Sequence, residues 1–149
     1  MSELTIGVNW LAVGITTFLC FGLGGLWYSP IMFGVKWVEG VGVAIEDGAS
    51  QPVAALLVQL VGTCLFAWLV ALAMGSGAMP LAKMIALTTS VLLVASGLFG
   101  DNSLYAALEE GAFVVAMFTI VVLCHEILKL SVISRQERHR DRTRWHYVS

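Results

Sequence analysis

Four ionisable residues flank the last apolar run of the chain, and they are the residues best placed for chemistry inside a membrane. Glu109 and Glu110 precede the run, and His125 and Glu126 follow it. The run has fourteen residues, from 111 to 124, which is about 21 Å of helix against roughly 30 Å of hydrocarbon in a bilayer. Unless the bilayer thins, one of the two pairs is therefore expected to enter the apolar zone, where ionisable groups are costly and usually face the interior of a helix bundle.

Two interpretations of these residues compete. In the first, Glu109 or Glu110 lies beside a cavity and handles protons or a cationic solute. In the second, both glutamates lie near the positive end of the helix dipole and reach outward to water. His125, Glu126 and Lys129 then form a cluster three and four residues apart at the cytoplasmic interface. The sequence favours the second interpretation.

Asn9 and Gln59 are the other polar side chains of interest within apolar runs, together with the Thr88-Thr89-Ser90 trio. Each needs a hydrogen-bond partner in lipid, and bonds between helices are the simplest expectation. A polar solute path lined by Asn9 and Gln59 is the alternative. The three cysteines have no metal-like spacing and are expected to be buried apolar residues. We expect no catalytic residues, no metal, no cofactor and no nucleic-acid partner.

The apolar runs that carry these residues predict an all-α integral membrane protein. Of 149 residues, 58% are apolar and only 12% are charged, and the runs lack the polar faces of a water-soluble fold. The first run is too long for a secretory signal and has no basic residue before it. We expect one four-helix bundle over residues 1–134, with helices at about 5–28, 52–74, 81–99 and 104–130. A short interfacial helix over about 31–45 and a basic tail over 135–149 complete the prediction.

Aromatic and basic residues predict how the bundle sits in the membrane. Pro30 is expected to end the first helix, and four aromatic residues typical of a membrane–water interface are expected to set its depth: Trp10, Trp27, Tyr28 and Trp37. The tail holds five arginines: Arg135, Arg138, Arg140, Arg142 and Arg144. An excess of basic residues favours the cytoplasmic side, so both termini are expected there, in the cell inner membrane. The tail is expected to be attracted to anionic lipid or, alternatively, to dock on a partner.

Small residues recur every fourth position on three of the predicted helices. They are Ala67, Ala71 and Gly75, then Ala82, Ala86 and Ser90, then Ala107 and Gly111. Such stripes allow helix backbones to approach closely in lipid. We expect them to pack the bundle, and a dimer face is the alternative.

Two short blocks near the N-terminus carry a family resemblance. The first reads Asn9-Trp10-Leu11-Ala12-Val13, and the second reads Leu26-Trp27-Tyr28-Ser29-Pro30 followed by Phe33-Gly34. The chain resembles the small bacterial integral membrane proteins grouped as a domain of unknown function, which share both blocks. The resemblance covers roughly the first quarter of the chain. It implies a four-helix membrane protein and supplies no catalytic or ligand residue.

The function expected from these observations is non-enzymatic. The chain would act by association in the lipid bilayer, as a homo-oligomer or as an accessory subunit of a membrane complex. The alternative is a small transporter or channel that uses Glu109 or Glu110 as an intramembrane carboxylate.

Overall fold

Five helices make up the part of the chain that the structure describes. This computed structural model describes residues 5, 7–42 and 53–145, excepting the side chains of 132, 133 and 135–145. The helices are α1 (Trp10–Trp27), α2 (Gly34–Val41), α3 (Val53–Gly75), α4 (Met79–Phe99) and α5 (Leu104–Trp145). Four segments are long and apolar enough to cross a membrane: α1, α3, α4 and residues Leu104–Ser131 of α5. The all-α fold and the four spanning candidates are therefore confirmed.

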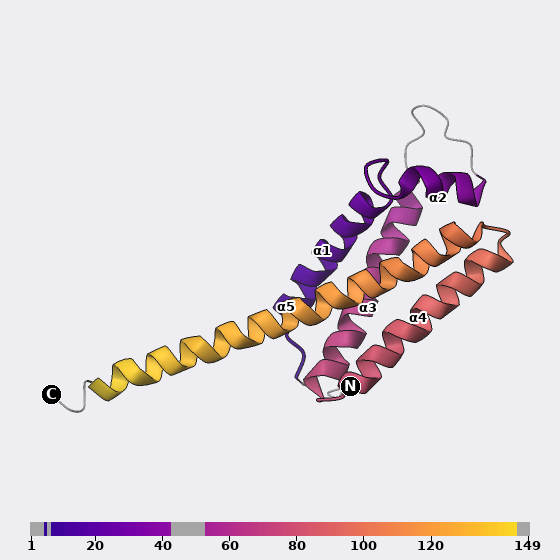
Figure 1. Ribbon diagram of the computed structural model, residues 1–149. Coiled ribbons are helices and arrows are strands. Elements are labelled where there is room, and N and C mark those ends of the chain that lie inside the picture. Colours follow the sequence, from indigo (N-terminus) through magenta and orange to yellow (C-terminus); the bar gives the residue numbers. More distant parts are fainter. Residues whose placement is uncertain (1–4, 6, 43–52, 146–149) are drawn as a thin grey trace.

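The long helices run alternately up and down, and α2 lies across one end of them (Figure 1). The N-terminal half of α5 packs among α1, α3 and α4. Its C-terminal half extends beyond the bundle as helix through Trp145 (Figure 1). Helix thus continues through much of the expected tail, while the side chains of Arg135, Arg138, Arg140, Arg142 and Arg144 lie outside the described residues.

α1 begins at Trp10, five residues later than expected, because Asn9 caps it. The Asn9 side-chain oxygen accepts the Ala12 amide at 3.1 Å, while the Asn9 backbone is extended. Such a cap satisfies one of the amides that the first turn leaves without a partner. The Asn9 side-chain oxygen therefore caps α1 and does not form the hydrogen bond to another helix that was expected.

α2 is shorter than the interfacial helix expected over 31–45. It ends at Val41, where Gly42 adopts a left-handed backbone with φ of 72°, as glycine commonly does at helix C-termini. Residues 43–45 of the expected segment lie outside the described residues.

The small-residue stripes pack inside the chain, as expected. Their alanines are buried, and Gly111 lies against α4, where Ser90 Oγ donates to the Gly111 carbonyl at 2.9 Å. A Cβ on Gly111 would come within 2.6 Å of Val94 Cγ2. Close backbone contact and one hydrogen bond therefore fix α5 against α4.

Candidate functional site

Aromatic rings from α1, α2 and α5 meet at the end of the bundle where α2 lies. We call this group the aromatic cap: Trp27, Tyr28, Phe33, Trp37 and Phe113. Ring centroids are 4.8 Å apart for Trp27 and Phe33, and 5.1 Å apart for Tyr28 and Trp37. Phe113 touches both Trp27 at 5.8 Å and Tyr28 at 5.5 Å. The rings meet in tilted and edge-on contacts, which are favourable at these separations, so the cap is a packed unit.

Glycines allow α2 to reach this position. A Cβ on Gly34 would overlap the Tyr28 carbonyl oxygen, and one on Gly40 would overlap Ser103 Oγ. The backbone amide of Ser103 donates to the Gly40 carbonyl at 2.7 Å. The end of α2 is thereby tied to the start of α5, about two helical turns before the two glutamates.

Glu110 is bound to the cap, and Glu109 is buried without a partner. The Trp37 indole Nε1 donates to Glu110 Oε1 at 3.2 Å. Glu109 is only 7% exposed, and neither of its carboxylate oxygens has a hydrogen-bond partner among the described residues. The interpretation in which both side chains reach outward to water therefore does not describe Glu109.

The charges of both glutamates affect the pKa of Tyr28 in the cap. Burial raises the pKa of the Tyr28 hydroxyl well above its usual range, and the charges of Glu110 and Glu109 raise it further. The phenol therefore stays protonated and can donate a hydrogen bond. Trp27 Nε1 is a second buried donor, and it has no partner among the described residues.

The opposite end of the bundle holds a cavity of about 430 Å³, which we call the His125 cavity. It is lined by residues before α1, at the end of α3 and on α5: Gly7, Asn9, Ala71, Met74, Gly75, His125, Glu126 and Lys129. His125 and Glu126 lie sixteen residues after Glu109 and Glu110, or about 24 Å along a helix. The two ionisable pairs therefore belong to separate sites.

The structure brings some of the expected residues together and separates others. Asn9 joins His125 and Glu126 at the cavity. Gln59 is exposed near the start of α3, sixteen residues before the cavity-lining Gly75, so Asn9 and Gln59 do not line a common path. Trp10 is half exposed beside Trp68, with ring centroids 5.5 Å apart.

One family covers most of the chain. The family described as "Protein of unknown function (DUF1761)" matches residues 11–130. The chain belongs to this family. No curated protein and no solved structure matches the chain. The matched region includes the aromatic cap, both glutamates and the α5 residues of the His125 cavity.

The aromatic cap was not predicted from the sequence, in which the residue types of Trp27, Tyr28 and Trp37 indicated only interface anchors. The available signal was the dense group of aromatic residues and glycines after the first helix. Nothing in that segment indicated that it would fold against Phe113 and Glu110, about 80 residues later in the chain.

The Trp37–Glu110 hydrogen bond can be measured by its contribution to stability. Trp37→Phe removes the N–H and retains a ring against Tyr28, so we expect the free energy of unfolding in detergent to fall by about 1–2 kcal/mol. The same change in a Glu110→Ala background should have little further effect. Trp10→Phe is the control, because no described residue accepts its indole N–H. Equal losses for Trp37→Phe and Trp10→Phe would contradict the assignment.

Proposed function

We propose that this chain is a non-enzymatic membrane transporter in which Glu109 binds a proton or a cationic solute. The observation that carries the proposal is the burial of both Glu109 oxygens without a partner. A buried carboxylate without a partner is strongly disfavoured unless it is protonated or neutralised by a cation. Ionisable residues within membrane segments usually mark ion or solute sites.

The aromatic cap supports this proposal. Glu109 and Phe113 are four residues apart on α5, so they are neighbours on the helix surface. Phe113 in turn contacts Trp27 and Tyr28. Aromatic faces attract cations, and a carboxylate beside them adds the opposite charge. The site therefore suits a proton or an organic cation more than an anion.

Labelling with dicyclohexylcarbodiimide tests the binding part of the proposal. This hydrophobic reagent modifies protonated carboxyl groups in apolar surroundings. In the purified protein, we expect Glu109 to be modified and the exposed Glu39, at the same end of the bundle, to be spared. Glu109→Gln should remove the modification, and Glu39→Gln should not. Tetramethylammonium, Na⁺ or K⁺ should slow the reaction if that cation occupies the site.

The same cations test transport in proteoliposomes loaded with a pH-sensitive dye. Addition of the effective cation to acid-loaded vesicles should raise the internal pH by exchange for protons. This response should be lost in Glu109→Gln and kept in Glu39→Gln. Transport is contradicted if wild-type vesicles show no pH response to any of the cations or to an imposed proton gradient.

We also propose that both termini lie in the cytoplasm and that the membrane is the cell inner membrane. The support is the placement of Lys83, Lys129 and the Arg-rich segment at one end of the helices, since basic residues favour the cytoplasmic side. A reporter enzyme active only outside the cytoplasm, fused after Ser149, should be silent. An active reporter would contradict this orientation.

Association with a second copy or with a larger membrane complex stays a prediction. The small-residue stripes are used inside the chain, so a partner would need another face. α1 offers one, because a Cβ on Gly14, Gly22 or Gly25 would meet no neighbouring atom within 4 Å. The mass of the purified protein in mild detergent measures this directly, and a monomer with no retained partner would contradict it.

A further inference from the structure

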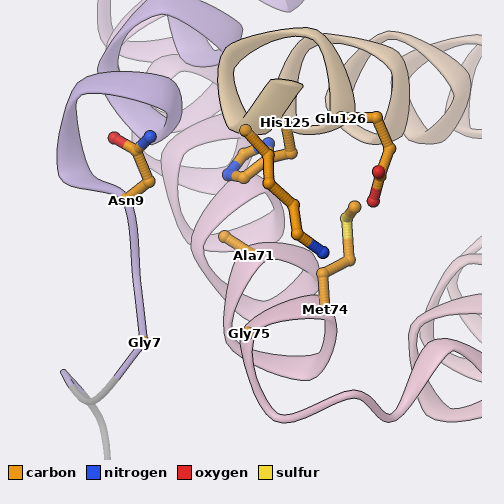
Figure 2. Close-up of a pocket in the computed structure, with 8 residues that line it drawn as sticks. Gly7, Asn9, Ala71, Met74, Gly75, His125 and Glu126 are labelled. Atoms are coloured by element: carbon orange, nitrogen blue, oxygen red, sulfur yellow. The ribbon is translucent and has the colours of Figure 1, made fainter. Parts of the chain in front are cut away.

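The His125 cavity is a second site, independent of Glu109, with unused polar groups of both charges. Figure 2 shows Asn9, His125, Glu126 and Met74 arranged around it, with Gly7 and Gly75 along its lower side. Its volume of about 430 Å³ lies in the range of small-molecule sites.

His125 lines this site, and one of its ring nitrogens lies buried without a partner among the described residues. Its Nδ1 lies 2.8 Å from the Val121 carbonyl oxygen, and a carbonyl only accepts, so Nδ1 carries the proton. In the neutral imidazole, Nε2 is then an acceptor. Nε2 is buried and has no partner among the described residues, so a ligand that reaches it with an N–H or O–H donor would satisfy it.

Glu126 and Lys129 add one negative and one positive group to the lining. They lie three residues apart on α5, a spacing at which opposite charges can meet. No ion pair joins them in the described structure. A purely anionic ligand would meet Glu126 and a purely cationic ligand would meet Lys129, so a zwitterion is the charge type that suits both.

Asn9 supplies a further donor. Its side-chain oxygen is used by the Ala12 amide, so its NH₂ group is left for a ligand at the cavity edge.

We propose that the His125 cavity binds a phosphoethanolamine group. The primary ammonium would lie against the Glu126 carboxylate and donate to His125 Nε2. The phosphate would lie against the Lys129 ammonium and the Asn9 amide. A trimethylated ammonium has no N–H, so it could not donate to Nε2, and the site should discriminate against phosphocholine.

The position of the cavity suits a lipid headgroup as the source. The cavity lies where α3 ends at Gly75 and where α1 begins at Trp10. On α5, His125 lies six residues before Ser131, where the apolar part of that helix ends. Lipid headgroups lie at this level of a spanning helix. A free phosphoethanolamine ester in the adjacent water offers the same chemistry, and the experiment distinguishes the two.

Native mass spectrometry of the full chain in mild detergent measures the preference. We expect phosphatidylethanolamine to bind about tenfold more tightly than phosphatidylcholine, because a hydrogen bond to a charged donor is lost with the latter. Phosphatidylglycerol should also bind more weakly than phosphatidylethanolamine. This comparison uses the wild-type protein, so it does not depend on how any variant folds.

Variants assign the effect to the cavity. Glu126→Gln and His125→Phe should each weaken phosphatidylethanolamine binding by about tenfold and bring it close to phosphatidylcholine. Lys83→Gln is the matched control, because Lys83 is exposed near the start of α4 and does not line the cavity. Soluble phosphoethanolamine that displaces the lipid supports the free ester as an additional ligand, and failure to displace it supports the lipid as the source.

Equal retention of the three lipids would overturn the proposal, and so would lipid selectivity that survives both cavity variants. These outcomes are separate from those at Glu109, because the cavity variants leave the aromatic cap unchanged.

Discussion

The close approach of α2 to the bundle is the constraint on which the site at Glu109 and Glu110 depends. Gly34 lies against the Tyr28 backbone, and Gly40 lies against Ser103 and Ala106, with no room for a Cβ at either position. The backbone atoms beside Gly34 and the Ala106 Cβ beside Gly40 cannot rotate away, so a larger residue at either position would move α2. This contact brings Trp37 within hydrogen-bond distance of Glu110. It also holds the Tyr28 ring against Phe113. The second block of the family resemblance, from Leu26 to Gly34, therefore has a structural role: it packs over the first turns of α5.

The second constraint is the packing of α4 on α5, which decides which face of α5 is left for α1 and α2. Gly97 and Ala107, and then Ser90 and Gly111, bring the two backbones together along their length. With that face occupied, Phe113 turns toward Trp27 and Gly24 of α1, and Glu109 lies one turn earlier. A pattern of small residues on one side of α5 therefore helps to position the charged and aromatic residues on the other.

Length and apolarity were enough to predict the four spanning helices, because a lipid environment demands long uninterrupted apolar runs. The fourteen-residue run on α5 indicated that one of its two ionisable ends would enter the apolar zone, but the sequence favoured glutamates that reach outward, whereas Glu109 is buried. Which glutamate is buried was not predictable, since that choice depends on how α2 folds back. Trp27, Tyr28 and Trp37 show the same limit. Residue type indicates an interfacial level, but the direction in which each ring turns depends on contacts with Phe113 and Glu110 that are distant in sequence. Asn9 was expected to bond between helices, but its side-chain oxygen caps α1 instead, because a short polar side chain beside a helix start can bond to the local backbone.

The distribution of unsatisfied groups separates structural polar residues from functional candidates. Between the two ends of the bundle, buried hydroxyls are satisfied by nearby carbonyls, as Thr16 is by Ala12 and Thr63 by Gln59. The buried polar side-chain atoms without partners belong, within the described residues, to Trp27, Glu109 and His125. Val114 and Val121 lie fully buried on α5 between these ends. A solute held at Glu109 would therefore face a packed apolar interior in this conformation. The proposed transport would require a second arrangement of the helices, and the ligand would have to favour one arrangement over the other by its contacts at Glu109.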